Sequence, residues 1–235
     1  MIDIQLMKYS GTELEIFEKA SNFRKYSYLL VKKFIGTKIL EVGAGIGSFT
    51  NTYIKNNSNI TVNDADDFNF ESLKRRFNTK KNVKVEKKNI NQLNDTYDTI
   101  MYMSVLEHIK DDKSEISNAL DKLDHKGNLI ILVPAHHGLY SNFDKEIGHF
   151  RRYEMNFFKN LNFNNAKVKK TFYVDSLGYV LYYLNKIIFK KNIYPTNFQV
   201  LLWDKIFVPL AMIFDFITLY KFGKNIICVI EKNNI

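Results

Sequence analysis

The sequence predicts an α/β fold in which a mostly parallel sheet carries helices on both faces. Strand-like and helix-like segments alternate through the first half of the chain, as they do in successive βαβ units. A glycine-rich turn at residues 43–47 joins the first strand-like segment to a helix-like one. Residues 97–103 are largely apolar, as expected of a parallel strand that is buried on both faces. These observations together predict an open α/β sheet of the nucleotide-binding type.

The elements of the first half follow from hydrophobic spacing and turn residues. Apolar residues from Leu14 to Ile35 repeat at helical spacing and predict a leading helix that ends at Gly36. The predicted strands lie at residues 38–42, 59–63, 83–85, 97–103 and 128–133. The predicted helices between them lie at residues 46–56, 69–77 and 111–123, the last stopped by residues 126–127.

The second half begins after Pro134 with a segment of different character. Residues 135–153 are rich in His, Gly, Asp and Arg and lack a clear period, and long loops at this point of an α/β sheet are usually functional. Two further strands are predicted at 167–174 and 226–231, with helices at 176–189 and 198–220. We therefore expect one domain over residues 1–235, in which residues 135–225 contain a substrate-facing loop and helices.

Composition restricts the class of protein. An apolar share of 46% excludes a disordered chain, and the single cysteine, Cys228, fits a reducing compartment. The net charge of +9 favours anionic partners, but the lysines are scattered, so nucleic acid is not the expected ligand. The first ten residues lack an apolar segment of the secretory type, and the apolar run at 206–214 is shorter than the ~20 residues of a membrane span. A cytoplasmic protein is expected.

The glycine turn is the leading candidate for a cofactor site. Gly43, Gly45 and Gly47, with Ala44 between them, allow a sharp strand-to-helix turn and a close approach of ligand to backbone. The preceding Glu41 can accept a hydrogen bond from a cationic amino group, whereas it would repel a pyrophosphate. This combination favours an aminoacyl nucleoside such as S-adenosylmethionine (SAM) over a dinucleotide.

Polar residues that follow the second and third strands extend the candidate cofactor site. Asp64, with its neighbour Ala65, lies about 20 residues beyond the glycine turn, where a carboxylate binds ribose hydroxyls. Asp66 is the alternative, and either carboxylate could instead cap the following helix. After the third strand, the side chain of Asn89 and the backbone N–H of Ile90 are candidates to bind an adenine edge.

The fourth strand adds backbone contacts to the same cleft. Met103 and Ser104 end this strand, so their backbone is expected to line the cofactor site. His108 follows closely and is a possible catalytic residue. Its neighbour Glu107 offers a carboxylate partner, however, and such a pair at a helix start more often has a structural role.

The loop after the fifth strand supplies the candidate catalytic residues. His136 and His149 are candidate bases, because imidazole is the side chain best matched to proton removal near neutral pH. Zinc binding by His136, His137 and His149 is the alternative. No cysteine lies nearby, and Arg151 and Arg152 add positive charge, so no metal is expected.

The same loop supplies the candidate acceptor-binding residues. These are Tyr140, Arg151, Arg152 and Tyr153. Paired arginines suit bidentate recognition of phosphate or carboxylate groups. The acceptor is therefore expected to be a small polar molecule, and an anionic group on it would suit the two arginines.

With these motifs identified, the chain resembles a class I SAM-dependent methyltransferase. The resemblance extends over nearly the whole chain, from residues 19–26 through the glycine turn to the helix that contains Asp204 and the final strand. The V-L-E-H stretch at 105–108, V-P-A-H at 133–136 and G-H-F-R-R-Y at 148–153 are similar to a subgroup often found among glycan and cell-surface biosynthesis enzymes.

This resemblance implies a Rossmann-like seven-stranded sheet with an antiparallel last strand. It also implies that Glu41, Gly43 and Gly45 surround the methionine part of SAM, that Asp64 binds the ribose and that Asn89 lies at the adenine. Two positions depart from the pattern. Asn89 stands where the family usually has Asp, and Met103 replaces an Asn of the subgroup.

The expected reaction is transfer of a methyl group from SAM to an oxygen of a small polar or glycan-related acceptor. N- or C-methylation is the enzymatic alternative, since the same fold supports both. A non-catalytic SAM-binding subunit and a nucleic-acid methyltransferase are further alternatives. The aromatic and basic helices after Tyr173 could also face a membrane surface or a lipid-linked acceptor.

Overall fold

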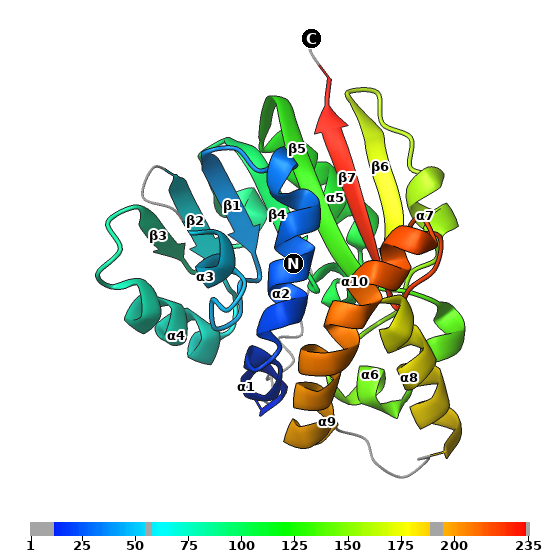
Figure 1. The fold of residues 1–235 in the computed structure, drawn as a ribbon. Helices are drawn as coiled ribbons and strands as arrows, with labels where there is room; N and C mark the ends of the chain where they lie inside the picture. Colours follow the sequence, from blue (N-terminus) through cyan, green and yellow to red (C-terminus); the bar gives the residue numbers. More distant parts are fainter. Residues whose placement is uncertain (1–11, 55–57, 189–194, 234–235) are drawn as a thin grey trace.

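A seven-stranded sheet forms the centre of the protein in the computed structural model, which describes residues 12–54, 58–188 and 195–233 (Figure 1). The strand order is β3-β2-β1-β4-β5-β7-β6. The strands are β1 (Lys38–Val42), β2 (Asn59–Asn63), β3 (Val83–Glu86), β4 (Tyr97–Met103), β5 (Leu123–Pro134), β6 (Ala166–Val174) and β7 (Asn225–Lys232).

The sheet is parallel except at β7. Strands β1 to β5 pair in parallel, whereas β7 lies between β5 and β6 and pairs antiparallel with both. Cys228, near the middle of β7, lies opposite Ile131 on one side and Thr171 on the other. The expected Rossmann-like sheet with an antiparallel last strand is therefore confirmed.

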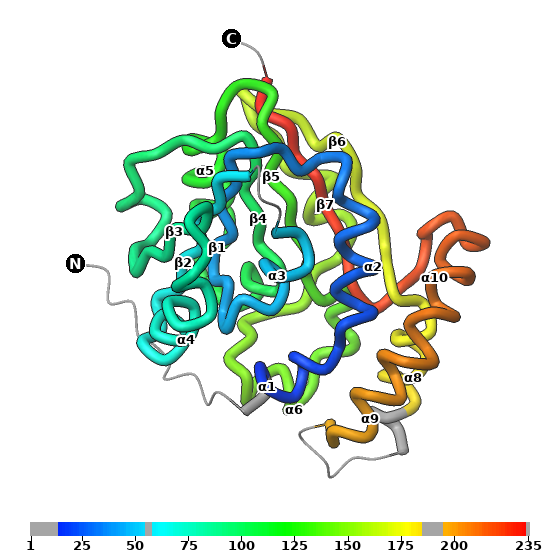
Figure 2. The backbone as a smooth tube through the Cα atoms, turned by 60° about the vertical axis from the view of Figure 1, so that its left-hand side comes forward, coloured from blue at the N-terminus to red at the C-terminus, as the bar shows by residue number. Residues whose placement is uncertain are grey.

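Helices pack on both faces of the sheet and enclose two apolar cores. One core includes residues of α2 (Ser21–Val31), α3 (Thr50–Tyr53), α4 (Asp67–Phe77) and α10 (Val208–Ile217). The core on the other face includes residues of α5 (Asp112–Asp121) and α7 (Met155–Lys159). Beyond the carboxyl ends of the parallel strands lie α1 (Thr12–Glu18), α6 (Asn142–Glu146), α8 (Ser176–Ile188) and α9 (Asn197–Leu202), as Figures 1 and 2 show.

Several element boundaries differ from the sequence prediction in the first half. The leading helix is divided into α1 and α2, and the helix after the glycine turn is reduced to α3. The end of that predicted helix, residues 55–56, lies outside the described residues. Strand β5 begins at Leu123 rather than at 128, so Gly127 lies inside a strand. A Cβ on Gly127 would lie 3.0 Å from the carbonyl oxygen of Asp98, which explains why a glycine is needed there.

The second half contains more structure than the sequence predicts. A short helix, α6, interrupts the segment that lacked a clear period, and a second one, α7, follows it. The helix predicted at 198–220 is divided into α9, a π-helical turn (Trp203–Phe207) and α10. The helix predicted at 176–189 is α8, and residue 189 lies outside the described residues. No helix in the described ranges is long and apolar enough to cross a membrane.

Candidate active site

A large cavity opens at the carboxyl ends of the parallel strands. Its volume is about 1950 Å³, roughly twice the upper end of the ~300–1000 Å³ usual for a ligand pocket. The glycine turn and the ends of β2 and β4 line one part of it, and residues of the loop after β5 line another. The cavity therefore has room for a nucleoside-sized cofactor together with an acceptor.

The glycine turn has the backbone geometry that its composition predicts. Gly43, Gly45 and Gly47 have φ values of 62°, 57° and 79°, in the left-handed region that favours glycine. A Cβ at Gly43 would lie 2.7 Å from a methyl carbon of Val105. The turn is held against β2, because the Ala44 N–H donates to the carbonyl oxygen of Asn63 at 2.9 Å. The backbone of residues 43–46 thus forms one wall of the cavity, whereas Gly47 does not line it and packs against Phe77 of α4.

Glu41 is the next-to-last residue of β1, and its carboxylate is buried beside this turn. Its Oε2 accepts hydrogen bonds from the hydroxyls of Thr50 and Tyr53, both at 2.7 Å. Burial raises the pKa of Glu41 to about 7, although these two hydrogen bonds act in the opposite direction. The residue lines the cavity and is therefore a carboxylate whose charge responds to a cationic ligand.

Asp64 connects the end of β2 to the glycine turn. Its Oδ2 accepts a hydrogen bond from the N–H of Gly45 at 2.8 Å, and its Oδ1 accepts one from the N–H of Asp66 at 3.0 Å. Burial raises the pKa of Asp64. Asp66 caps α4 by accepting from the N–H of Asn69 at 3.0 Å, which is the alternative role that its position predicted. Both carboxylates line the cavity.

The remaining predicted cofactor residues also lie at this part of the cavity. Ala65, Asn89, Ile90, Met103 and Ser104 line it. Asn89 precedes a short helical turn, where its N–H donates to the side-chain oxygen of Gln92 at 3.0 Å.

Buried polar atoms in this cavity provide a test of whether a polar ligand fits. Most of the buried side-chain atoms without a hydrogen-bond partner, within the described ranges, belong to residues that line it. They are Ser27 Oγ, Ser48 Oγ, Asn63 Oδ1, Asn69 Oδ1, Glu107 Oε2 and Asn225 Nδ2. Because an unpartnered buried polar atom is costly, these atoms fit a ligand with several hydrogen-bonding groups. A nucleoside with an amino-acid side chain has such groups.

The two candidate bases lie in different surroundings. His149 lines the cavity, and its Nδ1 is hydrogen-bonded to Asp144 Oδ1 at 2.9 Å. His136 does not line it. Its Nε2 lies 2.9 Å from the carbonyl oxygen of Gly223, and its ring stacks on Tyr173. Of the two histidines, the structure brings His149 to the candidate active site.

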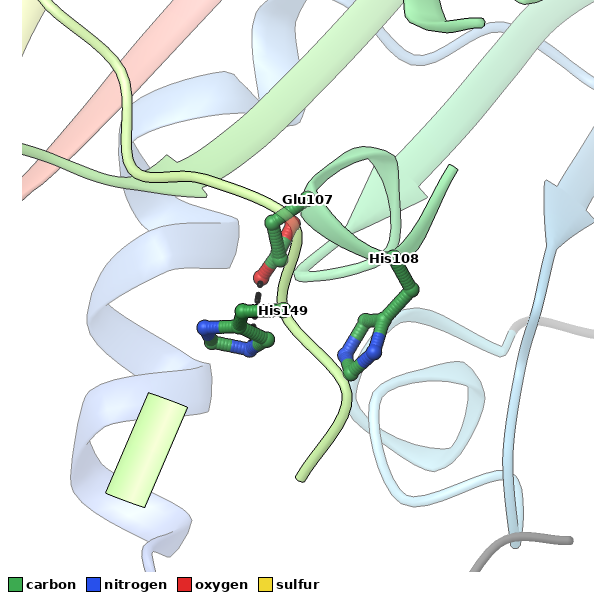
Figure 3. A group of neighbouring side chains, drawn as sticks. All are labelled: Glu107, His108 and His149. Carbon is green, nitrogen blue, oxygen red and sulfur yellow. Dashed lines mark ion pairs between the residues drawn. The ribbon is translucent and has the colours of Figure 1, made fainter. Parts of the chain in front are cut away.

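Glu107 and His108 lie beside His149, although the sequence favoured a structural role for them (Figure 3). Both line the cavity from a short 3-10 helix after β4. The Oε1 of Glu107 is 3.8 Å from Nε2 of His149, and the rings of His108 and His149 meet edge to face at 4.6 Å. Burial raises the pKa of Glu107 to about 7 and lowers that of His108 to about 3.

Asp144 holds His149 and Arg152 together in this region. Its Oδ1 accepts hydrogen bonds from both side chains at 2.9 Å, and it is fully buried. Burial alone would raise its pKa, but the hydrogen bond to His149 and the charge of Arg152 hold the pKa of Asp144 well below its usual range. Sequence reasoning did not single out this residue. Its place in the same loop as His149 and Arg152 was the available signal.

Two of the four predicted acceptor-binding residues line the cavity, and the other two lie outside its lining. Tyr140 and Arg152 line the cavity, whereas Arg151 and Tyr153 do not. Arg151 is ion-paired with Asp112 at 2.5 Å, and the hydroxyl of Tyr153 donates to the same carboxylate at 2.9 Å. Arg151, Arg152 and Tyr153 are thus bonded to buried carboxylates of the protein itself.

Comparisons with known proteins agree with this geometry. Residues 40–129 match the family model of a methyltransferase domain. A search of curated proteins found no match. The fold is similar to that of magnesium protoporphyrin IX methyltransferase from Synechocystis PCC 6803 with bound S-adenosylhomocysteine, at 14% identity over 93% of this chain and 84% of that chain, with a TM-score of 0.56.

Two solved N-methyltransferases also have a similar fold. One is coclaurine N-methyltransferase bound to N-methylheliamine and S-adenosylhomocysteine, at 14% identity over 90% of this chain and 72% of that chain, with a TM-score of 0.60. The other is NodS from Bradyrhizobium japonicum WM9, at 12% identity over 92% of this chain and 97% of that chain, with a TM-score of 0.55. The domain match over residues 40–129 supports a methyltransferase, and the solved structures show a shared fold.

Proposed function

We propose that this SAM-dependent methyltransferase transfers a methyl group to a hydroxyl oxygen of a small polar, glycan-related acceptor. One observation carries the proposal. A single cavity contains a glycine turn with a buried carboxylate in one part and a histidine–carboxylate pair in another. The first group suits the cofactor, and the second suits a nucleophile that must lose a proton.

The cofactor residues of the proposal are those around the glycine turn. SAM supplies an electrophilic methyl group on a sulfonium centre. Glu41 would bind the amino group of its methionine part, and the backbone of Gly43 to Gly45 would bind alongside. Asp64 supports the turn through its bond to Gly45 and, with Asn63, offers acceptor oxygens toward a ribose.

His149 is the residue that we propose to act on the acceptor. A hydroxyl is a weak nucleophile until its proton is removed, whereas a neutral amine already has a free electron pair. Asp144 accepts a hydrogen bond at Nδ1 of His149, which leaves Nε2 as the proton acceptor. This pairing favours an O-methyltransferase over an N-methyltransferase.

The charge of the site favours a neutral polar acceptor. Arg151 and Arg152 are each paired with a buried carboxylate, so neither guanidinium needs an anion from the substrate. We therefore assign Arg151 and Arg152 a structural role, in which their ion pairs hold the loop after β5 in place. A sugar hydroxyl is neutral, and it carries a proton that His149 could remove.

The experiment uses SAM carrying a ¹³C-labelled methyl group. The purified protein is incubated with a panel of sugars, nucleotide sugars and amines, and NMR identifies the atom that receives the label. We expect an O-methyl product from a sugar. Label on nitrogen or carbon would contradict the assignment to oxygen. His149→Gln should retain SAM binding by calorimetry while turnover falls by about 10²–10⁴-fold, the usual contribution of a general base.

A lipid-linked acceptor is a second candidate, which the surface of α9 and α10 favours. Large apolar side chains in residues 198–217 are exposed to solvent, while neighbours in α9 line the cavity. The exposed residues are Phe198, Leu201, Ile206, Leu210, Ile213, Phe214, Phe216 and Ile217. Exposed apolar surface combined with a net charge of +9 suits an anionic lipid surface.

Flotation with phosphatidylglycerol vesicles tests this second candidate. Co-flotation of the wild-type protein, lost in the double variant I213S/F216S, would support it. If the wild-type protein stays at the bottom of the gradient, the acceptor is not presented on a lipid surface. Phosphatidylcholine vesicles provide the control for charge.

A further inference from the structure

We propose that Glu107, His108 and His149 form a binding site for one divalent transition-metal cation at the acceptor part of the cavity. Each of the three residues offers one ligand atom, and these atoms lie within 4.8 Å of one another. They come from two separate segments, the 3-10 helix after β4 and the loop after α6 (Figure 3). The zinc site considered from the sequence consisted of His136, His137 and His149. The present site keeps His149 but does not include His136 or His137.

The spacing of the ligand atoms fits a shared cation better than it fits a direct hydrogen bond. Glu107 Oε1 and His149 Nε2 are 3.8 Å apart, which is too long for a hydrogen bond. Two ligand atoms that each lie ~2.1 Å from a common ion are separated by at most about 4.2 Å. Small rotations of the side chains would therefore bring all three atoms to bonding distance of one ion.

An unpartnered side-chain oxygen of Glu107 is a second, independent indication that a ligand binds here. The carboxylate of Glu107 is buried, and its Oε2 has no hydrogen-bond partner in the described part of the chain. Leaving such an oxygen unsatisfied costs free energy, and an ionised carboxylate costs more than a neutral group. A cation bound by both carboxylate oxygens of Glu107 would satisfy Oε2 together with the Oε1 that faces His149.

Both histidines already have the outer partners that metal ligands use. Nδ1 of His149 is hydrogen-bonded to Asp144, whose same oxygen accepts from Nε of Arg152 at 2.9 Å. His108 is hydrogen-bonded to the backbone of Gly148. Partners of this kind hold the ring and leave its second nitrogen for the ion, and they are typical of carboxylate–histidine–metal sites.

The ligand set identifies the class of ion. Two imidazoles and one carboxylate suit Zn²⁺, Co²⁺, Mn²⁺ or Fe²⁺, whereas Mg²⁺ and Ca²⁺ prefer all-oxygen sites. Three protein ligands leave coordination positions open toward the cavity, as catalytic metal sites do. An acceptor oxygen could occupy one of these positions.

The consequence for chemistry rests on the proposed function. A hydroxyl bound to the cation loses its proton to solvent more readily, because the ion stabilises the oxygen's negative charge. The new oxygen–carbon bond forms as the carbon–sulfur bond breaks, and the electron pair of that bond stays on sulfur. With the ion bound, Nε2 of His149 would be a metal ligand instead of the base assigned above, and the cation would activate the acceptor in its place.

Metal binding is tested on the full chain without any acceptor. Protein stripped with EDTA is titrated with Co²⁺ and followed by visible absorption, and its zinc content after dialysis against Zn²⁺ is measured by mass spectrometry. We expect one ion per chain and cobalt bands that report nitrogen ligation. The variants E107Q and H149Q should bind at least tenfold more weakly. His137→Ala is the matched control, since it removes an exposed imidazole of the same loop.

The outcomes separate this inference from the proposed function. Failure of the wild-type protein to bind Co²⁺ or Zn²⁺, or equal binding by H149Q and the control, overturns the metal site. SAM binding is measured by calorimetry in the same stripped samples. Loss of SAM binding with metal binding intact would contradict the proposed function alone. Circular dichroism of each variant shows that a weak site does not result from unfolding.

Discussion

The carboxylate of Glu41 is buried where a charged group is costly. It is stabilised by only two hydroxyl donors, so its pKa is raised to about 7. A cationic amino group beside it would favour the ionised form and lower that pKa again. If Glu41 binds the amino group as proposed, its protonation would oppose cofactor binding.

SAM affinity should depend on pH because of this residue. As pH rises from 6 to 8, Glu41 ionises and the dissociation constant should fall by about tenfold, in proportion to the ionised fraction. Calorimetry at several pH values measures the change. In Glu41→Gln the affinity should be weak and nearly independent of pH. A wild-type affinity that does not vary over this range would show that Glu41 does not bind the amino group.

Asp144 offers a second test at the residue scale. It is fully buried and accepts hydrogen bonds from His149, Arg152 and Tyr182. Asp144→Asn leaves the Arg152 charge buried without a counter-ion, which should cost roughly 3–5 kcal/mol of unfolding free energy. Urea denaturation measures this. Asp95→Asn, which alters an exposed ion pair with Lys84, should cost less than about 1 kcal/mol.

The placement of residues at strand ends could be predicted from the sequence, whereas the contacts that His149 makes with other segments could not. The placement of Glu41 near the end of β1 and of Asp64 directly after β2 follows from the topology, which brings the carboxyl ends of parallel strands to one edge of the sheet. Glu107 and Asp144 are far apart along the chain, and their approach depends on how the segment after β5 folds back. No short sequence pattern predicts how the segment after β5 folds back.

At the scale of elements, α2 depends on a distant residue for its N-terminal cap. The helix has no side-chain cap of its own. Instead, the carboxylate of Asp204 accepts hydrogen bonds from the N–H groups of Asn22 at 3.1 Å and Phe23 at 2.9 Å. Asp204 lies in the π-helical turn between α9 and α10. The π-helical turn thus places the carboxylate of Asp204 where it caps α2.

Removing the Asp204 cap should lower the stability of the fold but leave the cavity wall at the glycine turn unchanged. Asp204→Ala should lower the free energy of unfolding by about 1–2 kcal/mol, as loss of an N-cap does. Chemical denaturation measures the loss. Thr196→Ala removes a local cap of α9 and provides a comparison, with a smaller expected effect because α9 is short. Equal stability of D204A and the wild-type protein would contradict the tertiary cap.

The glycine turn is the other element whose geometry can be tested. Gly43→Ala adds a Cβ at φ 62° and 2.7 Å from Val105, so it should cost at least about 1–2 kcal/mol. Gly138→Ala is the matched control, since nothing lies within 4 Å of its added Cβ. Thermal melts of both variants are the measurement. A G43A variant as stable as G138A would mean that the turn can relax.

Element positions were predicted best where a period is repeated. The five parallel strands and α4 follow from apolar spacing and turn residues. The single helix predicted at 198–220 is instead broken at Trp203–Phe207, because apolar periodicity does not reveal a π-helical turn. Helices α6 and α7 have five residues each, too few for a period to be recognised.

At the scale of the whole molecule, several buried carboxylates have raised pKa values. Burial is the main cause for Glu41, Asp64, Glu115 and Asp175. A carboxyl whose pKa is higher in the folded state than in the unfolded state stabilises the fold at low pH. This contribution is complete below the unfolded value and is lost as pH rises through the folded value.

The ligand-free protein should therefore become less stable as pH rises from about 5 to 8. The Glu41 contribution, from its usual pKa near 4.5 to about 7, corresponds to roughly 3 kcal/mol over that interval. Melting temperatures measured across the interval test this expectation. Glu41→Gln should reduce the decline. A melting temperature that rises steadily toward pH 8 would contradict it.

Strand β7 lies inside the sheet although it is the last strand along the chain, and this has a consequence for synthesis. Strand β6 joins the sheet only through β7, so it has no neighbour until residues 225–232 have left the ribosome. The first five strands can assemble earlier, because they pair among themselves. A ribosome that pauses within residues 175–224 would therefore expose the edges of β5 and β6, which are sites for aggregation and for chaperone binding.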